Sequence, residues 1–177
     1  MFFFNSKIIT ILLLILVSLL PACRNRSQQK PVDPSEFKEP LIKANQDAML
    51  EEKEQIDDFI RRRQWKMDET STGLRYMIIK HGIGAVARPG KTVKLDYSVT
   101  LLTDDTLYSG RKDGPIIFEV GKGQVITGLE EAILLLRVGD RAKFIIPSHL
   151  AYGLIGDQRK INHKASLVYD LEFISMY

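Results

Sequence analysis

Residues 92–102 alternate strictly between apolar and polar side chains. The apolar members are Val93, Leu95, Tyr97, Val99 and Leu101. This period of two is the spacing of side chains on one face of a β-strand, whereas a helix repeats every 3.6 residues. The segment is therefore predicted to be a strand with one buried face.

Similar runs, separated by turns rich in Gly, Pro and Asp, continue from about Thr72 to the end of the chain. The predicted strands are residues 73–79, 92–102, 115–120, 141–147 and 166–176. Residues 129–136 are too densely apolar for an exposed helix, so one side of this helix must lie on the sheet. We predict an α+β fold in which an antiparallel sheet wraps around one short helix. The long loop predicted at 148–164 is of a length that is usually functional.

The first 22 residues are rich in apolar side chains and contain no acidic residue. Their apolar run, residues 8–20, follows Lys7. It is shorter than the roughly 20 residues that cross a hydrocarbon core, but it fits the apolar region of a secretory signal. The alternative is an uncleaved anchor that includes residues 2–4, but the polar residues 5–7 interrupt that longer stretch.

The segment Leu20-Pro21-Ala22-Cys23 stands at the end of this run and resembles the lipobox of bacterial lipoproteins. The resemblance implies that residues 1–22 are a signal peptide and that Cys23 carries the lipid. More than one acyl chain on Cys23 would anchor the protein stably, because stable attachment needs at least two membrane signals. The expected location is the cell envelope, on a bacterial membrane facing the periplasm or the cell surface.

Residues 23–40 are polar, contain three prolines and show no apolar periodicity, which predicts a flexible tether. Residues 41–66 lack Gly and Pro and consist mainly of strong helix formers. They are predicted to form a long charged helix with Pro40 in its first turn. This helix and a short connector make up residues 41–71, and the β-rich domain makes up residues 72–177.

Ile56, Phe59, Ile60 and Arg63 follow helical spacing and form one narrow stripe that can rest on another surface. Two hypotheses stay open for this stripe, which are self-association of the 41–66 helix and formation of one wall of a client cradle. The run Arg61–Arg63 suggests binding to phospholipid headgroups. Nearby acids cancel its field, however, and this favours a solvated helix face.

The sequence lacks the familiar catalytic devices. His81, His149 and His163 are far apart and form no metal-ligand motif, so no metal site is expected. Cys23, the single cysteine, lies outside the β-rich domain, and no nucleophile elbow occurs. Gly121-Lys122-Gly123 is only a weak match to a phosphate-binding loop. The net charge of +3 gives no strong field for a polyanion, so nucleic acid is not expected as a partner.

Four segments support a family resemblance. They are residues 125–131 (VITGLEE), 138–143 (VGDRAK), 146–153 (IPSHLAYG) and 165–172 (ASLVYDLE). In order and spacing they resemble the FK506-binding-protein (FKBP) type of peptidyl-prolyl cis-trans isomerase over residues 72–177. With the lipobox and the charged helix, the whole chain resembles the lipoprotein members found in Bacteroidetes, some of which are linked to gliding motility.

The resemblance implies an isomerase that acts on proline-containing exported polypeptides and needs no cofactor. Three residues are implied to be catalytic, namely Tyr152, Ile126 and Tyr97. Ile126 would offer its backbone N–H, and Tyr152 its hydroxyl, to substrate carbonyls. The implied substrate-binding residues are Tyr108, Ser109, Ile116, Phe118, Val125, Leu129, Ile161 and Tyr169. Simple core packing is the alternative for each apolar member.

The sequence departs from the family pattern at three of these positions. Ser109 stands where the family has an aspartate, Leu129 where it has a tryptophan, and Ile116 where it has a phenylalanine. These changes predict a looser pocket, slower catalysis and weaker binding of macrolides. The alternative function is a catalytically weak or idle chaperone, tethered to the membrane, that uses the same pocket. A lipid-surface protein that acts through Arg61–Arg63 is a third hypothesis.

Overall fold

The computed structural model describes residues 34–177, with side chains from Lys38 onward. The predicted signal peptide, Cys23 and most of the predicted tether lie outside the described residues. The chain divides into two compact units, Met1–Lys43 and Ala44–Tyr177. The second unit holds the whole β-rich region together with the C-terminal part of the charged helix.

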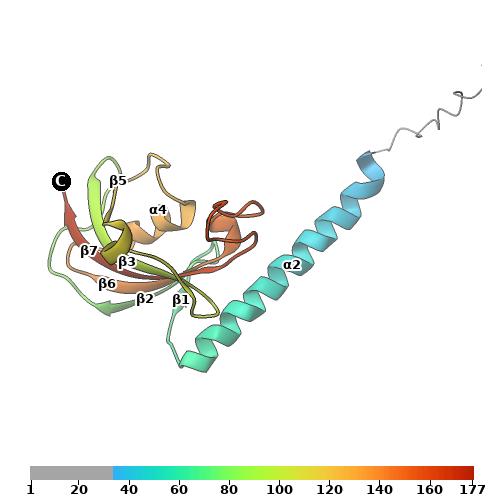
Figure 1. Cartoon of the computed structure of the whole chain (residues 1–177), viewed down its shortest axis with the longest axis horizontal. Coiled ribbons are helices and arrows are strands. Elements are labelled where there is room, and N and C mark those ends of the chain that lie inside the picture. The colour runs from blue at the N-terminus through green and yellow to red at the C-terminus, as the bar shows by residue number, and fades with distance from the viewer. Residues whose placement is uncertain (1–33) are drawn as a thin grey trace, which may run out of the picture. The chain divides into compact units, whose positions relative to one another are not determined.

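The β-rich region forms a seven-stranded sheet whose strands all pair in antiparallel fashion (Figure 1). The strands are β1 Asp68–Glu69, β2 Arg75–Lys80, β3 Thr92–Leu101, β4 Thr106–Ser109, β5 Ile116–Glu119, β6 Arg141–Ile146 and β7 Leu167–Met176. The strand order is β1-β2-β6-β7-β3-β4, and β5 also pairs with β3. The predicted antiparallel sheet is confirmed. The sequence pattern predicts neither β1, which has only two residues, nor β4, whose apolar residues Leu107 and Tyr108 are adjacent and show no alternation.

Strand β3 lies at the centre of this arrangement, since it pairs with β4, β5 and β7. Val93, Leu95 and Val99 are fully buried, and Tyr97 and Leu101 are partly buried against the same core. The predicted strand with one buried face is therefore confirmed.

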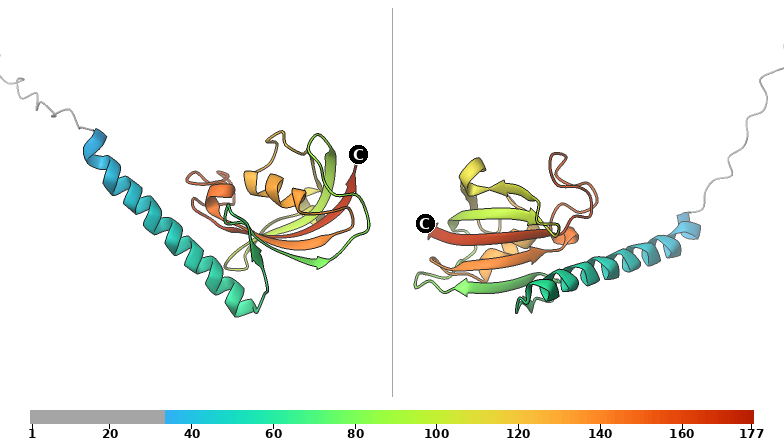
Figure 2. Two further views of the ribbon diagram at one scale, coloured as in Figure 1. Left: turned by 180° about the vertical axis from the view of Figure 1, so that it is seen from behind. Right: turned by 60° about the horizontal axis from the view of Figure 1, so that its bottom comes forward.

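The short helix α4, Thr127–Leu134, lies against the concave face of the curved sheet (Figure 2). It buries Leu129, Ala132 and Ile133 in the main core. A side chain at Gly128 would place its Cβ only 2.3 Å from Ile146 Cγ2, so glycine permits the close approach of helix and sheet. The predicted helix exists, although it begins at Thr127 rather than Leu129 and ends at Leu134.

The charged helix α2 extends from Pro34 to Arg63. Its predicted bounds, 41–66, are wrong at both ends, and the last part of the predicted tether is helical. Proline is well suited to a first helical position, and the helix begins at Pro34 and contains Pro40. The helix ends because Gln64 adopts a left-handed backbone conformation (φ 53°) and the Trp65 N–H bonds to the Ile60 carbonyl at 3.2 Å. No glycine marks this end in the sequence.

The C-terminal part of α2 packs on the face of the sheet opposite α4. Ile56 and Phe59 form a second apolar cluster with Ile145 of β6 and Val168 of β7. The neighbours of Ile145 and Val168 along each strand belong to the main core, so these two side chains point to the other face. The prediction that the stripe rests on another surface is confirmed, and that surface is the sheet of the same chain.

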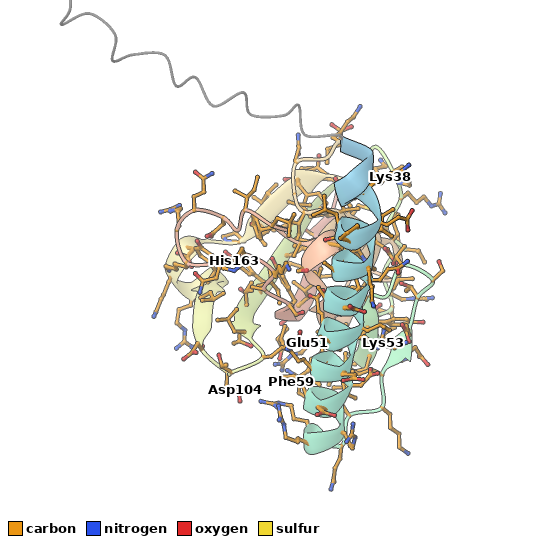
Figure 3. All side chains as sticks on the ribbon, turned by 90° about the vertical axis from the view of Figure 1, so that its right-hand side faces the viewer. Lys38, Glu51, Lys53, Phe59, Asp104 and His163 are labelled. Carbon is orange, nitrogen blue, oxygen red and sulfur yellow. The ribbon has the colours of Figure 1, made fainter. Side chains whose placement is uncertain are left out.

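The end of α2 is fixed by contacts with a single arginine. The guanidinium of Arg63 lies 3.6 Å from the centre of the Phe59 ring and forms an ion pair with Asp104. Figure 3 shows Phe59 and Asp104 near the same end of α2. Arg61 bonds within the helix to Asp58, and both Arg61 and Arg62 are exposed, which agrees with a solvated helix face.

Two short helices complete the description, α3 at Gly110–Asp113 and the 3-10 helix η1 at Ser148–Leu150. The latter opens the predicted long loop, which runs to the start of β7. Among residues 34–177, no helix is long and apolar enough to span a membrane.

Candidate active site

A cavity of about 390 Å³ lies between β3, β4, the start of α4 and the loop that follows η1. Its lining residues are Tyr97, Val99, Tyr108, Ile116, Gln124, Val125, Ile126, Leu129, Tyr152, Asp157, Arg159 and Tyr169. Four of these side chains are tyrosines and most of the others are aliphatic. The cavity thus offers an apolar interior with a few polar groups, as small-ligand sites do.

The structure brings most of the predicted site residues together at this cavity. Those that line it are Tyr97, Tyr108, Ile116, Val125, Ile126, Leu129, Tyr152 and Tyr169. Phe118, Ile161 and Ser109, which the resemblance also placed here, do not line it.

These three residues have other positions for physical reasons. Phe118 is 3% exposed and pairs with Val93 across β5 and β3, so both side chains point into the core. Ile161 is 4% exposed and belongs to the same core. Ser109 precedes α3, and its N–H donates to Asp113 Oδ2 at 2.9 Å.

Ile126 lies at the N-cap of α4 with an extended backbone (φ −60°, ψ 148°). Its carbonyl accepts the N–H groups of Leu129 and Glu130 at 3.0 and 3.1 Å, which fixes the peptide at the helix start. Within the described part of the chain, the Ile126 N–H donates to no other group. A cavity-lining residue therefore presents an unused backbone donor.

Tyr152 follows η1 and is 38% exposed at the edge of the cavity. Its hydroxyl makes no hydrogen bond to any of the residues described. Burial, followed by the nearby negative charge of Asp157, raises the pKa of the Tyr152 hydroxyl. The hydroxyl is therefore protonated near neutral pH and available to donate a hydrogen bond.

Tyr97 and Tyr169 supply aromatic surface deeper in the cavity. Burial is the largest cause that raises the pKa of each phenol, and Asp113 and Tyr152 add to the effect at Tyr97. Both rings are thus neutral at physiological pH. An uncharged aromatic wall favours the entry of an apolar ring and excludes water.

Asp157 is a site residue that the sequence predictions missed. The Tyr108 hydroxyl donates to its Oδ2, and its Oδ1 accepts the N–H groups of Arg159, Lys160 and Ile161 at 2.9, 2.9 and 2.7 Å. Burial opposes ionisation, but these hydrogen bonds outweigh it and lower the pKa of Asp157 to about 2. The same carboxylate raises the pKa of Tyr108 to about 12.

Ser109 stands where the family has an aspartate, and Asp157, in the loop, supplies a carboxylate at this site instead. In the sequence, only the position of this acidic residue in a long loop could have indicated its role, because a loop carboxylate can accept hydrogen bonds from the backbone N–H groups that follow it. Three more cavity residues were missed. Val99 lies on the predicted buried face of β3, and Gln124 and Arg159 line the opening without a motif that marks them.

Replacing Tyr108 by phenylalanine is expected to raise the pKa of Asp157 from about 2 towards its ordinary 3.8, because a donor to the ionised carboxylate is lost. A depressed pKa in the folded state stabilises the fold above the ordinary pKa. In the wild type this contribution is therefore lost as the pH falls from 3.8 to about 2, and in the variant it is smaller.

Titration of the Asp157 carboxyl carbon by NMR checks this expectation. Tyr97→Phe is the matched control, since the Tyr97 hydroxyl forms no hydrogen bond to Asp157. An unchanged pKa in Tyr108→Phe would show that the backbone N–H groups alone hold the carboxylate.

Among the described residues, no group of three or more His, Cys, Asp or Glu side chains is placed to hold a metal ion. The described cavity contains one carboxylate, and that group is already bonded to Tyr108. The chemistry that this site offers is therefore desolvation and hydrogen bonding.

Comparison with known proteins decides the family. The model of the FKBP-type peptidyl-prolyl cis-trans isomerases matches residues 84–174, a range that contains every residue of the cavity. The chain belongs to this family. The fold and the isomerase class predicted from the sequence are thereby confirmed for this FKBP-type chain.

Two known isomerases and one solved structure are also similar to this chain. Peptidyl-prolyl cis-trans isomerase FPR2 of Saccharomyces cerevisiae is 39% identical over 92 residues, which cover 51% of this chain and 68% of the yeast protein. The FKBP-type isomerase FkpA of Aeromonas hydrophila is 35% identical over 138 residues, and these cover 76% of this chain and 50% of that protein. The crystal structure of AtFKBP13 superposes with a TM-score of 0.61 at 27% identity, covering 64% of this chain and all of AtFKBP13.

Proposed function

We propose that this protein is a membrane-tethered prolyl isomerase that assists the folding of exported, proline-containing polypeptides. The observation that carries the proposal is an aromatic cavity with two unused donors at its edge, the Ile126 N–H and the Tyr152 hydroxyl. The isomerase activity follows the family, whereas the exported substrates and the tether follow from the N-terminal sequence.

The cavity would accelerate rotation about the X–Pro bond by excluding water from the amide. A planar amide owes its double-bond character to resonance that places negative charge on oxygen, and rotation about an X–Pro bond faces a barrier of roughly 18–20 kcal/mol. The twisted amide loses that resonance and is less polar. An apolar wall formed by Tyr97, Leu129 and Tyr169 therefore destabilises the planar form more than the twisted one.

The two donors would hold the peptide while it rotates. A substrate carbonyl bonded to the Ile126 N–H fixes one side of the proline, and a second carbonyl bonded to Tyr152 fixes the other. The free half of the chain then turns about the C–N bond. No covalent bond forms or breaks during this rotation, so the proposed step needs neither a nucleophile nor a metal.

Of the three departures from the family pattern, only two still account for the expected slower isomerisation in this structure. Asp157 fills the role of the acidic group that Ser109 does not provide, because it bonds to Tyr108 from the loop. Leu129 and Ile116 still give smaller walls than the family's aromatic residues. We therefore attribute slower catalysis and weaker macrolide binding to lost aromatic surface rather than to the missing charge.

The membrane tether rests on the lipobox-like segment that ends at Cys23. Labelled palmitate is expected to enter the wild-type chain in bacterial cells and to be absent from Cys23→Ser, because the thiol is the point of attachment. Ser18→Ala, which changes the apolar run but keeps the cysteine, is the control. Equal labelling of Cys23→Ser and the wild type would contradict the tether.

The lipoprotein subtype, with its link to gliding motility, is part of the same proposal. It is supported by the order of signal-like segment, charged helix and isomerase domain. The FkpA match covers more of this chain than residues 72–177 alone contain, so the likeness extends into α2. Self-association through the 41–66 helix would have to use residues other than Ile56 and Phe59, which the sheet of the same chain covers.

A chaperone function is the second candidate, because Leu154 and Ile155, which follow the cavity residue Tyr152 in the loop, are 70% and 73% exposed. Two assays separate it from catalysis. The full chain should accelerate the proline-limited refolding phase of ribonuclease T1, and Tyr152→Phe should reduce that acceleration. Suppression of aggregation without any acceleration would favour the chaperone and contradict the isomerase proposal.

A further inference from the structure

The loop between β6 and β7 carries two residues of the cavity, Tyr152 and Asp157. Loops of such length are mobile unless other parts of the protein hold them. The loop begins at Ser148 and ends at Ser166, and both serines are buried. The contacts of these two serines therefore decide how firmly the loop is held.

One carboxylate bonds to both ends of the loop. Glu52 of α2 accepts the Ser148 N–H at 2.6 Å and the Ser166 hydroxyl at 2.6 Å on Oε1. Its Oε2 accepts the Ser148 hydroxyl at 2.9 Å. Hydrogen bonds to an ionised acceptor are stronger than those between neutral groups. Glu52, on a helix that precedes the β-rich region in sequence, thus connects the two ends of a loop that lies within that region.

The helix is itself fixed close to Glu52. Ile56, one turn further along, and Phe59 pack on the sheet, and Asp57 bonds to Arg75 at 3.1 Å. The Arg75 side chain is only 6% exposed. Because these contacts do not involve Glu52, the helix has anchors of its own, and Glu52 extends from a fixed support.

Hydrogen bonds connect Glu52, through Ser148, to the backbone on either side of the cavity residue Tyr152. The Ser148 carbonyl accepts the N–H groups of Ala151 at 3.0 Å and Gly153 at 2.8 Å, the residues on either side of Tyr152. Farther along the loop, the Lys164 N–H bonds to the Gly153 carbonyl at 2.8 Å. These hydrogen bonds connect the backbone on both sides of Tyr152, through Ser148, to Glu52.

From this geometry we infer that Glu52 is a positioning residue of the isomerase site, which holds the 148–166 loop so that the Tyr152 hydroxyl faces the substrate. The inference rests on the isomerase function proposed above. It also makes the charged helix, whose N-terminal end leads towards Cys23 in the sequence, a working part of the site rather than a spacer.

The test measures kcat/KM for isomerisation of a proline tetrapeptide by the full chain. Glu52→Ala is expected to lower kcat/KM about tenfold, because a catalytic donor is displaced. Glu52→Gln should recover most of this loss, since an amide keeps an acceptor and can donate to the Ser148 hydroxyl. Glu51→Ala is the control, since the only described hydrogen bond of its side chain is to Gln55 within the helix.

A double-mutant cycle separates positioning from general support of the fold. In a Tyr152→Phe background, Glu52→Ala should lower kcat/KM less than ~2-fold, because the hydroxyl that Glu52 positions is already gone. A loss of about tenfold in both backgrounds would overturn the inference.

Amide hydrogen exchange provides a readout that does not depend on activity. The Ala151 and Gly153 amides should exchange faster in Glu52→Ala than in Glu51→Ala, and near the wild-type rate in Glu52→Gln. Equal exchange in Glu52→Ala and Glu51→Ala would overturn the positioning role even if the wild type were inactive. A wild type without isomerase activity would instead refute the proposed function.

Discussion

Replacing Phe59 by alanine is expected to lower the free energy of unfolding by about 3 kcal/mol, the low end of the cost of truncating a buried phenylalanine. The ring is 1% exposed and packs with Ile56, Ile145 and Val168. It also meets the edge of Trp65 at 5.6 Å, and the Arg63 guanidinium covers it. Alanine would leave a cavity at the contact between helix and sheet.

Urea unfolding of the full chain measures the effect, and Leu50→Ala is the matched control. Leu50 lies on the same helix but is 62% exposed, so its truncation should change the free energy by less than about 0.5 kcal/mol. Equal values for the two variants would show that α2 does not contribute to the stability of the β-rich domain.

Replacing Ile126 by proline is expected to lower kcat/KM for prolyl isomerisation about tenfold. The change removes the N–H that would bond to a substrate carbonyl, and one hydrogen bond of about 1.4 kcal/mol corresponds to a factor of ten. The backbone suits this substitution, because φ at residue 126 is −60° and proline fixes φ near −65°. Since no described residue accepts this N–H, its loss breaks no hydrogen bond of the described fold.

Ile126→Ala is the matched control, since it shortens the side chain but keeps the N–H. The alanine variant should retain most of the activity, and both variants should unfold at similar urea concentrations. If proline and alanine lower kcat/KM equally, the side chain and not the N–H matters, and the proposed role of Ile126 is wrong.

Most strands of the sheet were predictable, because alternation of apolar and polar residues indicates a strand with one buried face, whereas the short strands β1 and β4 were not. Strand β3 shows this pattern clearly, and β7, its partner, and β6, which pairs with β7, follow it in part. The docking of α2 was only half predictable. The stripe of Ile56 and Phe59 indicated that the helix rests on something, but the partner surface consists of Ile145 and Val168, two apolar residues on strand faces that alternation assigns to solvent.

The site was predictable where a residue stands in a recognisable segment, as Ile126 and Tyr152 do. It was not predictable where loop conformation decides. Asp157 reaches Tyr108 only because its loop folds back over the cavity, and Glu52 reaches Ser148 across 96 positions of the sequence. Such contacts depend on tertiary structure and leave no local pattern. For Phe118 and Ile161, membership of the core and of the cavity wall cannot be distinguished from residue type.

The most direct test of the account is a protease-coupled assay of cis-to-trans isomerisation of a proline tetrapeptide by the full chain, kept soluble in mild detergent. The account predicts a rate that rises in proportion to protein concentration above the uncatalysed rate, and a smaller rise for Ile126→Pro and Tyr152→Phe. An isomerisation rate equal to the uncatalysed one, from protein shown to be folded, would contradict it.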